Sequence, residues 1–347
     1  MKSLRSWSSW LARALVAMPL AAQAATVFFL GVNVLVWDEF YYVDMIRQAR
    51  AGENWLPWLL LQHNEHRVVP MKLAMVPLAL LTRWNMKAEM YFSAFLAALI
   101  VLGLWRLYRH AGGRDLLLFA PAAWLACNLA GYQNMLYGMM MCFYFTVLGV
   151  VWALVFLARR TLGGLLLAMG CGVMASFSIL NGFVVWPAGL LALLAWRERP
   201  GRIALWIAAG LASVLVYLRN FQIAPNTHPV ALDPAGLVRI ARFTVTALGA
   251  PLGAGSVPWS AALGLTVLAA VLALAIRWRR EGRERWAAEA LPAALVLFGL
   301  LSCGVIAVGR ASDPIAAVES RYVAFSSLGL VGLYLCIARA AEGPAPW

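Results

Sequence analysis

The chain has 347 residues, of which 63% are hydrophobic and only 12% are charged, and its mean hydropathy is +0.78. Soluble domains carry about 45–50% apolar and about 25% charged residues, so this composition excludes an ordinary soluble enzyme, a disordered chain and a disulfide-linked scaffold. A helix needs ~20 mainly apolar residues to cross a bilayer. The sequence therefore predicts an all-α, polytopic transmembrane bundle that forms one integral membrane domain over residues 1–347.

The first apolar run begins after three basic residues and continues to Val36. A cleaved signal peptide has an apolar core of about 7–15 residues, and this run is longer. We therefore expect an uncleaved first span whose N-terminus is cytoplasmic, where Lys2, Arg5 and Arg13 would lie.

Residues 37–87 form the longest stretch that is not plainly membrane-spanning, and they carry charges of both signs. The stretch contains two amphipathic pieces, residues 55–61 and 68–82. The second piece is too short and too closely flanked by charge to be counted as a span. Both pieces are expected as helices that lie in the outer interface.

The remaining apolar runs bring the expected number of spans to ten. They cover residues 88–108, 116–134, 135–158, 161–180, 183–196, 203–219, 256–276, 287–309 and 322–340. A second outer segment, residues 219–255, holds Pro, Asn and Gly residues that argue against a continuous span, and it includes an expected interfacial helix with Arg239 and Arg242. A third outer loop covers residues 310–321.

The formal charge of +13 suggests nucleic acid in a soluble protein, but in a membrane protein the cytoplasmic loops collect Lys and Arg. With ten spans and both termini cytoplasmic, 17 of the 28 basic residues and 6 of the 15 acidic residues fall inside. Topology thus explains most of the excess, and no nucleic-acid partner is expected. The basic residues are Arg at all but three positions, a bias that favours a GC-rich bacterial source and the bacterial inner membrane.

An acidic pair, Asp38 and Glu39, follows the first span directly within the run WDEFYY. Ionisable groups near the membrane are costly and tend to be functional. The alternative is a pair of solvated loop carboxylates. The pair is the first candidate for catalytic residues.

A second polar cluster contains His63, Glu65, His66 and Arg67, and Lys72 follows it closely. His and Glu can ligate divalent cations, so a bound metal stays open and no other cofactor is required. Two histidines three residues apart without further ligands are weak evidence for a metal. We therefore favour hydrogen bonding to a sugar or a phosphate.

The third outer loop carries Arg310, and it ends with Arg321 and Tyr322 at the head of the last span. A guanidinium group binds phosphate with two parallel hydrogen bonds, so these arginines are candidates for a lipid phosphate. The alternative is an interfacial Arg that extends to water beside an aromatic belt residue.

Three runs of residues together resemble the GT-C glycosyltransferases, in an order similar to that of protein O-mannosyltransferases and bacterial aminoarabinose transferases. The runs are WDEFYY, RQARAGENWLP and HNEHRVVPMKL, and they are followed by a span that starts near residue 88. The resemblance covers residues 30–115, and Arg321-Tyr322 matches a late outer Arg-Tyr pair within residues 310–340.

The resemblance implies transfer of a sugar from a polyprenyl-phosphate donor to a lipid, glycan or protein acceptor on the periplasmic face, with inversion. Asp38 would be the general base, with Glu39 beside it. The implied donor and phosphate contacts are Lys72, Arg310, Arg321, Tyr322 and Arg67. The implied acceptor or sugar contacts are His63, Glu65, His66, Tyr41 and Trp55.

Two other functions remain as alternatives. A transporter or flippase for a lipid-linked sugar would show internal repeats and helices broken at the midplane, whereas the charges here gather toward one outer surface. A glycan polymerase or ligase is expected to carry its large outer loop late in the chain, and here that loop comes early.

Overall fold

The computed structural model describes residues 2–223 and 229–341, with side chains described for residues 10–223 and 229–339. The chain is 80% helical, and the described part contains no strand, which confirms the all-α class. The longer helices are α1 (Lys2–Leu30), α4 (Met86–His110), α7 (Met141–Leu157), α8 (Leu162–Ser176), α10 (Pro200–Leu218), α11 (Pro234–Gly249), α12 (Val257–Glu281), α14 (Ala290–Arg310) and α15 (Val323–Ala341). The shorter helices are α2 (Val43–Arg50), α3 (Val69–Thr82), α5 (Leu116–Ala126), α6 (Tyr132–Leu136), α9 (Val185–Ala195) and α13 (Arg283–Ala288). The 3₁₀ turns are η1 (Trp37–Tyr42), η2 (Leu56–Leu60), η3 (Leu129–Gly131), η4 (Gly138–Met140), η5 (Leu180–Val184), η6 (Pro314–Val318) and η7 (Ser320–Tyr322).

Eight helical segments in the described part of the chain are long and apolar enough to cross a membrane. They are Trp10–Leu30, Met86–His110, Leu116–Leu136, Gly138–Leu157, Pro200–Leu218, Val257–Glu281, Ala290–Arg310 and Ser320–Arg339. Each corresponds to one of the ten predicted spans. The predicted spans at 161–180 and 183–196 correspond to shorter helices, so eight spans are supported and the count of ten is not.

A tight turn explains why these two helices are short. α8 ends at Ser176, and the chain then folds back on itself before α9. A Cβ on Gly182 would lie only 1.8 Å from the carbonyl oxygen of Ala175, so only glycine allows the two segments to approach this closely. Asn181 fixes the turn by donating from Nδ2 to the Ser302 carbonyl oxygen at 3.1 Å.

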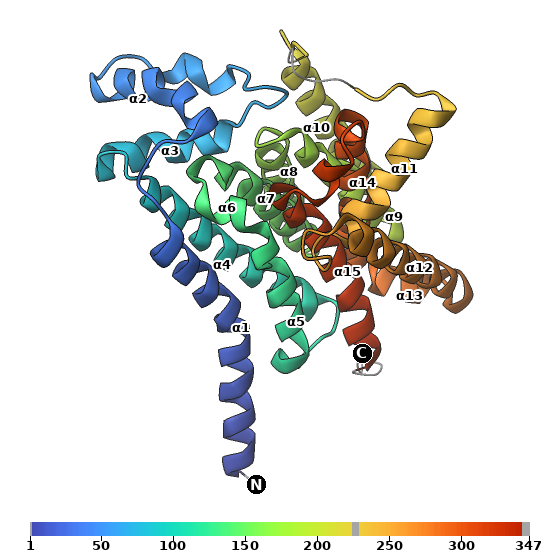
Figure 1. The fold of residues 1–347 in the computed structure, drawn as a ribbon. Helices are drawn as coiled ribbons and strands as arrows, with labels where there is room; N and C mark the ends of the chain where they lie inside the picture. Colours follow the sequence, from blue (N-terminus) through green and yellow to red (C-terminus); the bar gives the residue numbers. More distant parts are fainter. Residues whose placement is uncertain (1, 224–228, 342–347) are drawn as a thin grey trace.

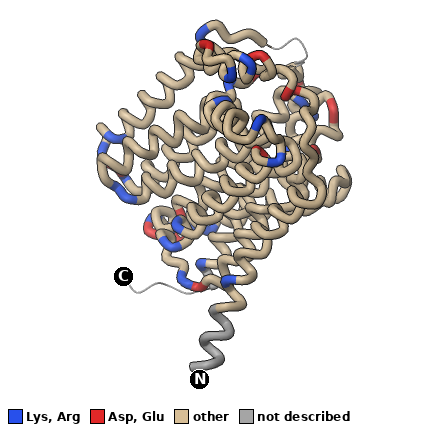
Figure 2. The backbone as a smooth tube through the Cα atoms, turned by 90° about the vertical axis from the view of Figure 1, so that its left-hand side faces the viewer, with Lys and Arg blue, Asp and Glu red and all other residues tan. Residues whose placement is uncertain are grey.

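The first and the last helix have their outer ends on the same side of the molecule. Figure 1 shows the beginning of α1 and the end of α15 in the lower part of the molecule, whereas α2 and α3 form a layer in the upper part. In Figure 2 the charged residues lie mainly at the periphery, and long tan stretches of helix carry none. This distribution fits an apolar slab between two polar surfaces.

α7 lies at the centre of the bundle, and most of its side chains are buried. Small residues let its neighbours approach closely, as is usual for helices that pack in membranes. Gly149 of α7 lies against the backbone of α8, where an added Cβ would be 2.7 Å from the Cys171 carbonyl oxygen. A similar contact joins α14 to α15, where Gly299 faces Gly329.

The outer segment 37–87 folds into η1, α2, η2 and α3 above the bundle (Figure 1). α3 has 14 residues and is not among the segments long enough to span, consistent with its exclusion from the predicted spans. Its buried side chains belong to the same apolar core as those of η1 and α2, among them Met71, Met75, Tyr42 and Met45. The predicted piece 55–61 becomes the 3₁₀ turn η2, on which Leu56 and Leu60 are exposed.

The predicted helix in the segment 219–255 is α11. It carries Arg239 and Arg242 as expected, and it lies alongside α12. Gly249, Ser260 and Gly264 permit this close packing, since a Cβ on Gly249 would lie 2.0 Å from the Ser260 carbonyl oxygen. α11 is therefore a packed part of the bundle.

Candidate functional site

The chain turns sharply where it leaves α1, and this turn presents Asp38. Trp37 adopts a left-handed backbone with φ 45°, a conformation that is uncommon for residues other than glycine. The backbone N–H of Asp38 donates to the Tyr137 hydroxyl at 2.9 Å, and the rings of Trp37 and Tyr137 meet edge to face at 5.7 Å. Tyr137, which precedes α7, thus fixes the turn that carries Asp38.

Asp38 is paired with His63. Its Oδ2 lies 3.4 Å from His63 Nε2, and the Asp38 side chain is 50% exposed whereas that of His63 is 7% exposed. The imidazole stacks on Tyr42 at 5.5 Å. Burial lowers the pKa of His63, although the Asp38 carboxylate opposes this effect. A neutral imidazole at neutral pH can therefore orient a carboxylate that solvent reaches.

Asp38 shares a cavity with Arg321, which comes from the far end of the sequence. The cavity measures about 390 Å³. Its lining residues are Trp37, Asp38, Gln133, Tyr137, Met140, Glu319 and Arg321. The structure thus brings together the predicted base and one of the predicted phosphate ligands, in a space that falls within the usual size of small-molecule sites, about 300–1,000 Å³.

Arg321 reaches the cavity because η7 docks on α6. Asn134 donates from Nδ2 to the Arg321 carbonyl oxygen at 3.0 Å, and the backbone N–H of Gln133 donates to Ser320 Oγ at 3.0 Å. The Arg321 guanidinium pairs with Glu319 at 2.5 Å and lies over the Tyr322 ring at 5.1 Å. The site therefore holds a cation whose present partner is a carboxylate.

Glu39 does not line this cavity. Its side chain is 1% exposed, and it accepts hydrogen bonds from the backbone N–H groups of Val36 at 2.9 Å and Met139 at 3.3 Å. Burial raises the pKa of Glu39, and these N–H donors oppose the rise. Glu39 thus connects the turn after α1 to the start of α7, which makes it a positioning residue.

Lys72 and Arg67 are engaged with backbone carbonyl groups. Lys72 Nζ donates to the carbonyl oxygens of Trp58 at 2.8 Å and Leu61 at 2.6 Å, and burial lowers its pKa to about 7. Arg67 Nη2 donates to the carbonyl oxygens of Tyr217 and Arg219. Both predicted phosphate ligands therefore fasten the outer layer, and neither lines the cavity of Asp38.

The backbone of His66 pairs with that of His63, and its side chain contacts the start of η5. Its Nδ1 accepts from the Leu180 backbone N–H at 3.2 Å. Burial, with His63 and Arg310 as further causes, lowers the pKa of His66 to about 4. Arg310, at the end of α14, forms no ion pair within the described residues, and its charge acts on both His66 and Tyr322.

The remaining predicted contacts lie around this centre. Tyr41 covers His63 edge to face at 5.1 Å and donates to the Gln62 carbonyl oxygen at 3.3 Å. Trp55 is partly buried against the core. Glu65 accepts the Tyr217 hydroxyl with its backbone carbonyl, so this contact does not use its carboxylate.

Sequence reasoning did not identify the cavity residues Gln133, Tyr137 and Glu319. Gln133 and Tyr137 lie at the junction of two apolar runs, where the sequence predicts a break between spans but no functional residue. Glu319 was visible as one acid of the third outer loop. Only their positions around Asp38 distinguish them.

The described part of the chain contains no group of three His, Cys, Asp or Glu residues close enough to hold a metal ion. The pair of Asp38 and His63 supplies two donors at most. A metal at this site would need its other ligands from substrate or water.

The eight long apolar helices define the chain as a multi-pass α-helical membrane protein, with a charged cavity where the polypeptide leaves the bundle. Comparison with protein-family models, with curated proteins and with solved structures finds no match.

Proposed function

We propose that the protein is a membrane glycosyltransferase of the GT-C kind, which transfers a sugar from a polyprenyl phosphate to an acceptor hydroxyl on the periplasmic face of the bacterial inner membrane. The observation that carries the proposal is the shared cavity of Asp38 and Arg321. It combines a carboxylate that solvent reaches with a guanidinium group. These are the two groups that transfer from a lipid phosphate needs.

In the proposed reaction, Asp38 accepts the proton of the acceptor hydroxyl while that oxygen forms a bond with the anomeric carbon of the sugar. The bond from the anomeric carbon to the phosphate oxygen breaks, and its electron pair leaves with the lipid phosphate. Arg321 stabilises the charge that develops on this phosphate, which requires the guanidinium to exchange Glu319 for the phosphate. Attack opposite the leaving group inverts the anomeric centre.

A second feature fits the lipid part of such a donor. An apolar groove of about 630 Å³ runs between α10 and α14, and its residues include Leu180, Tyr217 and Val308. The groove ends close to His66, which contacts Leu180, and to Arg310 at the end of α14. A prenyl chain in this groove would bring its phosphate toward Arg310.

The decisive experiment compares Asp38→Asn with Asp44→Asn. Both changes replace one carboxylate by an amide, but Asp44 is exposed and pairs with Arg47 on the surface of α2, outside the cavity. With a radiolabelled polyprenyl-phosphate sugar and a membrane extract that supplies acceptors, we expect Asp38→Asn to lose about 10²–10⁴-fold in transfer rate and Asp44→Asn to keep the wild-type rate.

Full transfer activity in correctly inserted Asp38→Asn protein would refute the proposal. Movement of labelled lipid across proteoliposome membranes without any transfer would favour the transporter alternative. Mass spectrometry of envelope glycans, from cells with and without the protein, would identify the sugar and its acceptor.

A further inference from the structure

A second cavity lies at the opposite end of α7. α7 begins beside the turn that presents Asp38 and has 17 residues, so its other end is about 25 Å away at a rise of ~1.5 Å per residue. There the ends of α4, α7 and α9, the helix α13 and the beginning of α14 surround a cavity of about 670 Å³. Its lining residues are His110, Ala158, Arg160, Trp196, Glu284, Ala287, Ala288 and Leu291.

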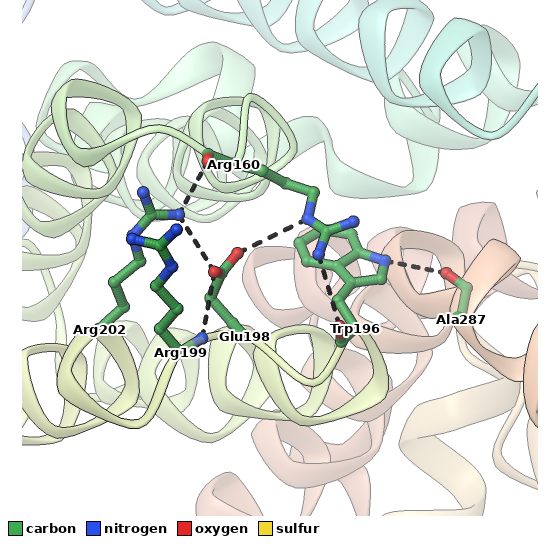
Figure 3. Close-up of polar contacts among 6 residues, drawn as sticks. All are labelled: Arg160, Trp196, Glu198, Arg199, Arg202 and Ala287. Carbon is green, nitrogen blue, oxygen red and sulfur yellow. Dashed lines mark hydrogen bonds and ion pairs between the residues drawn. The ribbon is translucent and has the colours of Figure 1, made fainter.

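Figure 3 shows a network around Glu198 that includes Arg160 and Trp196, two residues that line this cavity. The Glu198 carboxylate lies 3.1 Å from Arg202 and 3.6 Å from Arg160, and Arg202 also donates to the Arg160 carbonyl oxygen at 2.8 Å. The loop after α7 is therefore tied to the loop between α9 and α10. This frame fixes the backbone from which the Arg160 side chain extends.

The Arg160 guanidinium is only loosely engaged. Its contacts are Glu198 at 3.6 Å and the Trp196 carbonyl oxygen at 3.5 Å, and its side chain is 55% exposed. An arginine has five N–H donors, and these two contacts leave three of them without a partner among the described residues, so they can bind an anion in the cavity. The Trp196 ring lies 6.0 Å from the guanidinium carbon, and its indole N–H is fixed by the Ala287 carbonyl oxygen at 2.9 Å.

The surroundings of the cavity are strongly basic. The neighbouring loops and helix ends carry Arg106, Arg109, Arg159, Arg197, Arg199 and Arg202. Among the acidic residues, Glu198 is shared by two arginines, and Glu289, which follows Ala288, pairs with Arg277 and Arg285. Glu284, which lines the cavity, is exposed. The net charge around the cavity therefore attracts an anion.

Half of the residues that line the cavity are apolar, and this indicates what kind of anion fits. They are Ala158, Ala287, Ala288 and Leu291, and Trp196 adds an amphipathic ring of the type found at membrane surfaces. Basic pockets between helices at this level of a bilayer are suited to anionic lipid head groups. We propose that this cavity binds the phosphodiester head group of an anionic phospholipid, with Arg160 as its main ligand and the apolar lining residues against its glycerol and acyl part.

The test measures lipid retention by the intact purified chain. In native mass spectrometry after incubation with phosphatidylglycerol or phosphatidylcholine, we expect the wild-type protein to retain the anionic lipid preferentially. Arg160→Gln is expected to weaken this retention about fivefold, the effect of roughly one basic residue at a membrane surface. Ala288→Leu, which fills the cavity without a change of charge, is expected to weaken it similarly.

The matched control is Arg47→Gln, which removes the same charge from an exposed position on α2 and should leave retention unchanged. Equal retention of the two lipids, or equal effects of Arg160→Gln and Arg47→Gln, would overturn the proposal. Displacement of phosphatidylglycerol by excess inorganic phosphate would show a site for free phosphate and would overturn the assignment to a lipid. Thermal unfolding in detergent checks that each variant is folded.

Discussion

Asp38 and Glu39 are neighbours in the chain, but the turn of η1 gives them different surroundings. Asp38 is half exposed beside His63 in the cavity, whereas Glu39 is buried and accepts two backbone N–H groups. The same functional group thus serves two purposes. A carboxylate that a substrate can reach is suited to proton transfer, and a carboxylate saturated by backbone donors is suited to fixing the loop.

At the residue scale, His66 predicts a dependence of stability on pH. Its pKa is lowered from 6.5 to about 4 in the folded protein, so between these values the unfolded chain binds more protons than the folded one. The contribution of His66 to the free energy of unfolding is therefore fully present above pH 6.5, and it is lost as the pH decreases toward 4. Thermal unfolding in detergent should show a lower midpoint temperature at about pH 5 than at about pH 7.

The variant His66→Asn keeps an acceptor for the Leu180 N–H but removes the titrating group. We expect it to flatten this part of the pH profile. Equal profiles for wild type and His66→Asn would contradict the assignment.

At the element scale, close helix packing depends on single glycines. A Cβ on Gly264 of α12 would lie 1.8 Å from the Val245 carbonyl oxygen of α11, a distance that the two backbones can relieve only by separating. Gly264→Ala should therefore destabilise the protein by about 1–3 kcal/mol, measured as a lower midpoint of thermal unfolding.

Gly170 of α8 provides the matched control. It has no neighbouring atom within 4 Å of an added Cβ, so Gly170→Ala should be neutral or slightly stabilising, because alanine favours the helix. Similar losses of stability in the two variants would contradict the packing argument.

At the scale of the whole molecule, the layer of α2 and α3 and the ends of the chain lie on opposite sides (Figure 1). The four cysteines Cys127, Cys142, Cys303 and Cys336 are buried and Cys171 is partly buried, so the native protein should react little with a polar maleimide. Single cysteines can then be introduced at exposed positions to report the side of the membrane on which each lies.

Two such substitutions test the proposed orientation. Asp44→Cys, on the exposed surface of α2, should be labelled in intact spheroplasts. Arg280→Cys, on the exposed end of α12, should be labelled only after permeabilisation. Labelling in the reverse order would place the cavity of Asp38 on the cytoplasmic side and would contradict the proposed use of a lipid-linked donor at the periplasmic face.

Local patterns predicted much of this architecture. The run of apolar residues in each long helix, and the charges that end it, are properties of short segments, so eight predicted spans appear as helices of sufficient length. The other two predicted spans correspond to apolar helices that are shorter than a full crossing requires. Residues 161–180 and 183–196 are apolar enough, but Gly182 allows a turn that is tighter than hydropathy can reveal.

The amino-acid sequence by itself determined that this is an all-α membrane protein, and it singled out Asp38, His63 and Arg321, because burial in lipid penalises charge and makes each exception visible. Only the tertiary structure decided which of these charged residues lie close together. It joined Asp38 to Arg321, assigned Lys72 and Arg67 to carbonyl groups and buried Glu39. The physical reason is that contacts between distant segments depend on how helices pack, and small residues and turns control this packing without leaving a periodic pattern in the sequence.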